Sequence, residues 1–246
     1  GAGAAAVAGA IASSGFVKLV SKAEAEGEKA NDLAKRQWMM FIDLRRCDGC
    51  RLCIKACQAG HYLPDEQRWL EVYEMTNSAG GTYFLPRPCM QCENAPCLRV
   101  CPVGATFKSS DGAILVDQNT CIGCRMCMAA CPYDARYFNW NDPLPAPQGL
   151  GGPKPEFPVP QQKSTVGKCV FCVHNTRVGK LPMCVEFCPM KALYIGDLVA
   201  DIATNGVETV KVSQFLKDND AMRDKENLGT RPRVYYIPGH GQVWSR

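Results

Sequence analysis

Sixteen cysteines gathered in four groups of four constrain this 246-residue chain more than any other feature of its sequence. A disulfide framework spreads its cysteines to join distant loops, whereas each group here lies within 11 to 20 residues. Structural zinc favours paired C-x2-C knuckles, and haem attachment needs a C-x-x-C-H run that the chain lacks. The groups are Cys47/Cys50/Cys53/Cys57, Cys89/Cys92/Cys97/Cys101, Cys121/Cys124/Cys127/Cys131 and Cys169/Cys172/Cys184/Cys188.

The spacing inside the groups is typical of ferredoxins, whose signature C-x2-C-x2-C-x3-C-P sends its fourth cysteine to a second [4Fe–4S] cluster. Three closely spaced thiolates can wrap three corners of a cubane, while a fourth cysteine one helical turn later points away. Residues 121–132 match fully, and residues 47–57 match with Gln58 in place of proline. Residues 89–102 widen the middle gap to four residues, and residues 169–189 widen it to eleven. The four copies predict four [4Fe–4S] clusters.

The order of the motifs predicts how they pair. Alternating runs around Ser109-Ser110-Asp111-Gly112 predict a β-hairpin between the second and third motifs. Residues 84–140 therefore form one two-cluster unit, and the first and fourth motifs, which flank it, must pair with each other. The predicted fold is α+β, with two bacterial 2[4Fe–4S] ferredoxin-like modules, one inserted within the other, and with hairpin and proline-rich loop insertions.

The remaining segments complete the predicted division of the chain. A second hairpin is expected within residues 58–88, with Trp69, Tyr73, Tyr83 and Phe84 in the core. Residues 213–222 predict a short helix, and residues 231–239 predict a strand and turn. The predicted parts are an N-terminal anchor and linker (1–37), a split module (38–83 and 165–200), an inserted module (84–140), a proline-rich loop (141–164) and a C-terminal extension (201–246).

Two segments have more than one interpretation. The proline-rich residues 141–160 indicate an extended segment, either an arm that wraps a partner or a tolerated insertion. Residues 1–17 are uncharged and rich in Ala and Gly, like the apolar core of a twin-arginine export signal. Ala23-Glu24-Ala25 could serve as a cleavage site. We expect instead that the segment is an uncleaved anchor, although it is short for a full membrane span. The alternative is an Ala-rich helix packed on a partner.

Several functions are not supported by the sequence. A net charge of +4 without a long basic block gives no reason to expect nucleic-acid binding. GAGAAA at residues 1–6 lacks the βαβ context of a dinucleotide site, and catalytic motifs are lacking, so a non-catalytic electron carrier is expected. His61, His174 and His240 are expected to form no site. Lys168 and Lys180 either raise the potential of a nearby cluster or are solvated.

The four motifs resemble those of the four-cluster iron–sulfur subunits of the dimethyl-sulfoxide reductase, polysulfide reductase and formate-dependent nitrite reductase type, which also occur in related quinone-linked respiratory complexes. The resemblance covers residues 38–200 and rests on CDGCRLCIKACQ, CMQCENAPCLRVCPVGATFKSSDGAILVD, CIGCRMCMAACPYDARYF and CVFCVHNTRVGKLPMCVEFCPMKAL. It implies four ligand sets: Cys47, Cys50, Cys53 and Cys188; Cys57, Cys169, Cys172 and Cys184; Cys89, Cys92, Cys97 and Cys131; Cys101, Cys121, Cys124 and Cys127.

The same resemblance implies a function and partners. The chain would relay electrons in a membrane-bound respiratory oxidoreductase on the extracytoplasmic (periplasmic) face. Its partners would be a quinone-reactive integral membrane subunit of the polysulfide-reductase type, and a molybdopterin or tungsten-pterin catalytic subunit or a multihaem cytochrome. Residues 174–183 are the extra residues in the widened gap of the fourth motif. They would either loop out beside a partner subunit or form a surface loop without a function. The alternatives are a cytoplasmic polyferredoxin subunit of a hydrogenase or dehydrogenase, and a zinc-rich structural protein.

Overall fold

The computed structural model describes residues 36–147, 149 and 152–240. The export-signal-like residues 1–17 and the possible cleavage site at residues 23–25 therefore lie outside the described residues. Within the described ranges, none of the helices combines the length and the apolar character that crossing a membrane requires.

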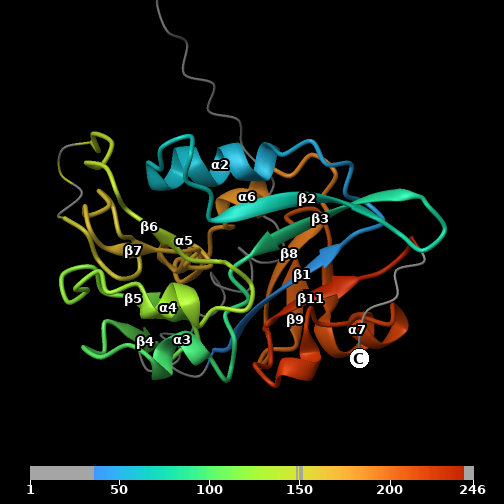
Figure 1. The fold of residues 1–246 in the computed structure, drawn as a ribbon. Coiled ribbons are helices and arrows are strands. Elements are labelled where there is room, and N and C mark those ends of the chain that lie inside the picture. The colour runs from blue at the N-terminus through green and yellow to red at the C-terminus, as the bar shows by residue number, and fades with distance from the viewer. Residues whose placement is uncertain (1–35, 148, 150–151, 241–246) are drawn as a thin grey trace, which may run out of the picture.

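A five-stranded sheet supports one side of the molecule, in the order β10-β9-β8-β1-β11 (Figure 1). The central strand β1 runs antiparallel to β8 and parallel to β11. Every residue of β1 and β8 is buried, as expected for central strands covered on both faces. The strands are β1 (Trp38–Asp43), β8 (Leu193–Asp197), β9 (Ile202–Thr204), β10 (Thr209–Lys211) and β11 (Val234–Ile237).

The C-terminal extension completes this sheet. It supplies β9, β10, β11 and the helix α7 (Val212–Asp218), so the predicted helix and terminal strand are both present. A 3-10 helix, η2 (Glu226–Leu228), precedes β11. The ring of Phe215 in α7 stacks on Phe41 of β1, with centroids 4.9 Å apart, and so covers one face of the sheet.

The helices of the first and fourth motifs lie side by side, although the second and third motifs separate them in the sequence (Figure 1). They are α2 (Leu52–His61) and α6 (Met183–Glu186). The second and third motifs likewise place α3 (Pro96–Arg99) beside α4 (Met126–Ala129). The predicted hairpin between them is confirmed: β4 (Thr106–Lys108) runs antiparallel to β5 (Ile114–Val116).

Helix length follows from the residue after the fourth cysteine of each motif. Where a proline follows that cysteine, the helix before it is only four residues long, because proline lacks an N–H and cannot continue a helix. Gln58 takes this place in the first motif, and α2 continues to His61. The Gln58 amide also donates hydrogen bonds to the backbone carbonyls of Asp65 and Gln67, at 3.0 and 3.2 Å, which fix the following turn.

The hairpin expected within residues 58–88 is formed by β2 (Leu70–Thr76) and β3 (Thr82–Pro88), which pair antiparallel. Trp69 and Tyr83 are buried, and Tyr73 and Phe84 pack against the same core, so their predicted role in packing is confirmed.

The described end of the proline-rich loop folds back onto the chain. Lys154 forms a β-bridge with Phe157, and Val159 is fully buried. Beyond it, β7 (Val166–Gly167) pairs with β6 (Tyr137–Phe138). Residues 158, 159 and 161 of this part are buried and pack against the chain itself, while residues 152–157 are exposed or half-buried; the partner-wrapping arm stays a prediction.

The excess residues of the fourth motif are not an idle surface loop. They begin in the short helix α5 (Val173–Thr176), and within residues 174–183 only Val178 and Lys180 are exposed. The Arg177 guanidinium donates to the Asp111 carboxylate at 2.8 Å, and Asp111 also accepts a hydrogen bond from the Trp38 indole at 3.1 Å. Asp111 is only 1% exposed, so this ion pair fastens the β4–β5 turn to the fourth motif.

We expect Asp111→Asn to lower the thermal stability of the chain. The substitution removes the charge that Arg177 and Trp38 contact, and a hydrogen bond to a charged group contributes about 2 kcal/mol. In a chain of this size that loss corresponds to a fall of about 4–8 °C in the midpoint of thermal unfolding, measured by circular dichroism.

Asp65→Asn is the matched control, because Asp65 pairs with Lys55 at 2.9 Å but has an 88% exposed side chain. An exposed pair contributes at most about 1 kcal/mol. Equal shifts in the two variants would contradict a structural role for the Arg177–Asp111 pair.

Candidate functional site

Three cavities are each lined by four cysteines from two different motifs. In every case three cysteines come from one motif and the fourth comes from a distant segment. The sets are Cys47, Cys50, Cys53 and Cys188; Cys89, Cys92, Cys97 and Cys131; and Cys101, Cys121, Cys124 and Cys127. We call these groups one, three and four.

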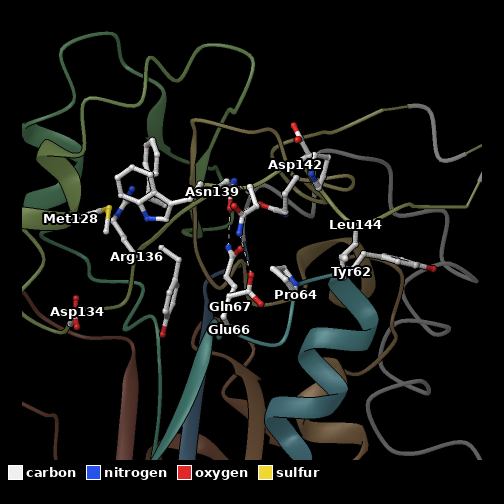
Figure 2. Close-up of a pocket in the computed structure, with 16 residues that line it drawn as sticks. Tyr62, Pro64, Glu66, Gln67, Met128, Asp134, Arg136, Asn139, Asp142 and Leu144 are labelled. Carbon is white, nitrogen blue, oxygen red and sulfur yellow. Dashed lines mark hydrogen bonds between the residues drawn. The ribbon is translucent and has the colours of Figure 1, made fainter.

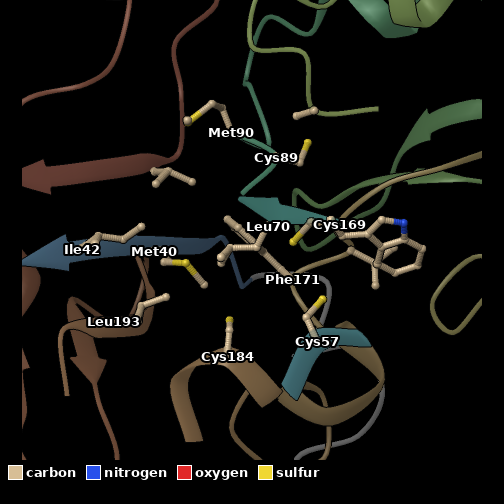
Figure 3. Close-up of a cluster of buried hydrophobic side chains, with 14 of the residues drawn as sticks. Met40, Ile42, Cys57, Leu70, Cys89, Met90, Cys169, Phe171, Cys184 and Leu193 are labelled. Atoms are coloured by element: carbon tan, nitrogen blue, oxygen red, sulfur yellow. The ribbon is translucent and has the colours of Figure 1, made fainter. Parts of the chain in front are cut away.

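The remaining four cysteines are buried together in the core and form group two, which contains Cys57, Cys169, Cys172 and Cys184. Figure 3 shows Cys57, Cys169 and Cys184 amid the apolar side chains of the core. Burial raises the pKa of Cys184 well above its usual value, and the nearby Cys172, Cys169 and Cys57 raise it further. The structure thus brings together the four sets that the sequence implies, while metal ligation by them stays a prediction.

All four motif loops share one backbone feature. The second residue after the first cysteine has a positive φ in every copy: Gly49, Gln91, Gly123 and Phe171. Glycine adopts this conformation without steric cost, whereas Gln91 and Phe171 adopt it at a cost of about 1–2 kcal/mol each. Such turns direct successive N–H groups into a concave site for an anion.

These backbone N–H groups already act on the thiols. The amide of Gly49 opposes the rise in the pKa of Cys47 that burial causes, and the amide of Phe171 does the same for Cys169. At Cys101 burial also raises the pKa, but the amides of Thr106, Val103 and Ala105 outweigh it, and the pKa is lowered.

The donor set fits iron–sulfur clusters. Burial raises the pKa of Cys53, Cys92 and Cys172 to about 12, so these thiols need a metal to lose their protons near neutral pH. Four convergent thiols with inward N–H groups suit a [4Fe–4S] cluster, whose net charge is negative. Any of the four groups could hold one.

The groups form a continuous series, in the order one, two, three and four, with exposed ends. Cys53 of group one lies within electrostatic reach of Cys57 and Cys184 in group two, and Cys89 of group three lies beside Cys169 of group two. Group three approaches group four at Arg136, a side chain within electrostatic reach of both. Cys50 in group one and Cys124 in group four are exposed, whereas all of group two is buried.

Two of the three histidines lie together rather than dispersed along the fold, while the expectation that they form no site of their own stays a prediction. His61 and His174 have ring centroids 5.4 Å apart, and their ring nitrogens lie with Cys172 Sγ in one group within 4.8 Å. His61 Nε2 is 3.6 Å from Cys172 Sγ, and Nδ1 is 3.0 Å from the Cys57 carbonyl oxygen. Since a carbonyl only accepts, Nδ1 carries the proton of the neutral ring.

Burial lowers the pKa of His61 to about 4, with a smaller contribution from His174, so this ring is neutral near pH 7. The two histidines share Cys172 with group two and are therefore part of its surroundings. The sequence signal for His61 was its place four residues after Cys57, on the same face of a helix that Gln58 allows to continue.

Of two buried cations near the cysteines, Lys168 and Arg136, the sequence indicated only Lys168. The solvated interpretation is wrong for Lys168, which is 1% exposed and donates to the Cys169 carbonyl at 2.7 Å. Arg136 is 2% exposed and lines the group three cavity, yet its place five residues after Cys131 was its only signal in the sequence. Gln91 is fully buried and links the second and fourth motifs through a 2.7 Å hydrogen bond to the same Cys169 carbonyl.

A groove of about 340 Å³ lies between the end of α2 and the start of the proline-rich loop and shares Arg136 with the cavity of group three (Figure 2). Gln67 and Asn139 cross its wall with a 3.0 Å hydrogen bond. Its described lining contains no cysteine or histidine, and its acidic side chains are Glu66, Asp134 and Asp142.

Comparison with known proteins gives the same chemistry. Two family models, each described as a 4Fe-4S dicluster domain, match residues 81–144 with 155–198 and residues 46–105. Together with the sixteen cysteines, these matches show that the chain binds several [4Fe–4S] clusters, consistent with four.

The chain is similar to three reductase subunits over most of its length. It is 42% identical to a subunit of the selenate reductase of Mesobacillus selenatarsenatis, over 82% of this chain and 72% of that protein. It is 39% identical to the iron–sulfur cluster-binding subunit of menaquinone reductase of Nitratidesulfovibrio vulgaris, over 82% and 89%. It is 37% identical to an iron–sulfur subunit assigned to a dimethyl sulfoxide reductase of Halobacterium salinarum, over 83% and 81%. The chain therefore belongs to the family of 4Fe–4S iron–sulfur subunits of dimethyl sulfoxide and polysulfide reductase type complexes.

Proposed function

We propose that this chain is the electron-transfer subunit of a membrane-bound respiratory oxidoreductase and relays single electrons through four [4Fe–4S] clusters. The observation that carries the proposal is the continuous series of four cysteine groups with its two ends exposed. A carrier needs an entry and an exit near the surface, with the intermediate centres shielded from solvent. Family membership favours this role over a cytoplasmic polyferredoxin.

We assign the ligands as the four groups. Each cluster would take three thiolates from one motif loop and one from its partner motif. The domain division proposed with it is a split module, residues 38–83 and 165–200, with residues 84–140 inserted. When bound, each cluster supplies a reversible one-electron couple, and the chain's part is to hold the thiolates, direct amide N–H groups at the sulfurs and exclude water.

Both exposed ends have apolar rims that suit partner subunits. Met190, which lines the group one cavity, is 44% exposed, and Leu52 nearby is 48% exposed. Ile122, which lines the group four cavity, is 64% exposed, and Met126 is 54% exposed. Large apolar side chains gathered at an exposed site mark protein interfaces.

We propose that one end faces a quinone-reactive integral membrane subunit of the polysulfide-reductase type. The other end would face a molybdenum or tungsten pterin subunit or a multihaem cytochrome, on the extracytoplasmic side of the membrane. The names of the similar proteins support this choice, since they include a menaquinone reductase and a selenate reductase. Export by a twin-arginine route would allow the clusters to be inserted before the chain leaves the cytoplasm.

The complex should be purified from membranes through this chain and assayed for iron, molybdenum, tungsten and haem. We expect about sixteen irons per chain. Molybdenum or tungsten near one per chain would identify a pterin partner, and haem without either metal would identify a cytochrome partner. Recovery of the chain in a soluble cytoplasmic hydrogenase or dehydrogenase would instead contradict the proposal.

Serine variants test the crossed ligand sets. If Cys188 belongs to group one, Cys188→Ser and Cys53→Ser should remove or alter the same cluster signal in electron paramagnetic resonance spectra of the reduced complex. Cys184→Ser should alter a different signal, although Cys184 and Cys188 lie one helical turn apart. Matching spectra for Cys184→Ser and Cys188→Ser would show that the fourth motif serves a single cluster and would contradict the assignment.

Gly123→Ala tests the tight loop of the third motif. Gly123 has φ +69°, and a Cβ there would lie 2.2 Å from the Ser164 carbonyl oxygen, so the loop must shift. We expect the purified variant to hold fewer irons, with a deficit approaching one cluster.

Gly104→Ala is the control, because Gly104 has a similar φ of +66° but open space around it. That control should cost about 1–2 kcal/mol of stability and keep its iron; equal iron contents would contradict the steric role of Gly123.

A further inference from the structure

Arg136 is a buried cation without a carboxylate partner among the described residues. It follows the third motif and is 2% exposed. Its Nη1 donates to the Thr106 hydroxyl at 3.1 Å, while its Nη2 is buried and has no oxygen or nitrogen acceptor within the described part of the chain. A buried charge left in this state costs several kcal/mol unless an opposite charge lies nearby.

The cysteines supply the missing negative charge, and they do so from two groups. Arg136 lines the cavity of group three, and its surroundings include Cys97 and Cys89 of that group. Thr106, to which Arg136 donates, lines the cavity of group four, and Cys127 of that group is within electrostatic reach of Arg136. Burial lowers the pKa of Arg136, but these three cysteines outweigh it, and the pKa is raised.

The guanidinium therefore lies between the two groups: it lines the cavity of group three, and the hydroxyl that it contacts lines the cavity of group four. A guanidinium is always charged in proteins, and its planar fork can address two acceptors at once. It therefore favours negative charge in both groups.

We propose that Arg136 is a shared counter-charge between the clusters of groups three and four and raises the reduction potentials of both. The inference rests on the proposed function, which places a cluster in each group. Reduction adds one electron to a cluster without breaking or forming a bond, and the electron comes from the quinone-reactive or catalytic partner. A fixed positive charge beside two clusters stabilises the reduced form of each, so the two steps move together.

The test is a potentiometric titration of the membrane-purified complex, followed by electron paramagnetic resonance, with Arg136→Met compared with wild type. Methionine keeps an apolar side chain in the cavity but removes the charge. We expect two of the four one-electron steps to shift to lower potential, each by at least a tenfold change in the reduction equilibrium, or about 59 mV for one electron. The other two steps should stay in place.

Arg68→Met is the matched control, since Arg68 has a 45% exposed side chain and pairs only with Glu71 at 2.9 Å among the described residues. It should shift none of the four steps. Arg136→Lys should lower the same two reduction potentials by a smaller amount, because one ammonium group cannot contact both cysteine groups as the planar guanidinium can.

Iron content separates the two proposals. About sixteen irons per chain with all four steps unmoved in Arg136→Met would overturn the role of Arg136 and leave the electron-transfer function standing. A shift in a single step would overturn the sharing between groups. If the methionine variant lost iron, Arg136→Gln would replace it, since glutamine also lacks the charge, and unmoved potentials in that variant would overturn the inference. Too little iron for four clusters in the wild-type complex would contradict the proposed function itself.

Discussion

The fold depends on one constraint: a loop of three closely spaced cysteines cannot close around four corners by itself. Each group therefore takes its fourth thiol from a distant segment, and the chain must bring the two segments together. For group one the sheet does this. Antiparallel pairing of Ile42 in β1 with Leu193 in β8 sets the start of the first motif beside the end of the fourth, where Cys47 and Cys188 meet. Slippage of this register would separate the thiols of group one.

The inner and outer groups solve the problem of buried charge differently. Groups one and four reach solvent at Cys50 and Cys124, where water can screen the charge of a cluster. The inner groups have no exposed cysteine, although Cys131 of group three is half-buried, and both groups lie beside fixed cations. Lys168 is buried next to Cys169 of group two, and Arg136 is buried beside group three. A buried cation is costly by itself, and so is a buried anionic cluster, but each reduces the cost of the other.

The cysteine groups could be predicted from the sequence because their chemistry is local. Spacing within a motif decides which thiols share a loop, and motif order indicates which loops pair. His61 could not be placed beside Cys172, since the two residues are 111 positions apart and nothing in the sequence joins them. The parallel pairing of β11 with β1 could not be predicted either, because the sequence of β11 indicates a strand but not the strand beside which it lies. The burial of Lys168 depends on the same long-range packing.

The widened gaps in two motifs follow from where their groups lie. The tight loops of the first and third motifs belong to groups one and four, which have exposed cysteines, whereas the widened loops of the second and fourth motifs belong to the inner groups. The extra residues contact other parts of the chain. Asn94 in the second motif donates its backbone N–H to the Thr230 carbonyl at 3.0 Å, and Arg177 in the fourth motif pairs with Asp111. Extra length in a motif thus attaches covering segments to the groups that must be kept from water, and the tight loops leave the ends open for electron exchange.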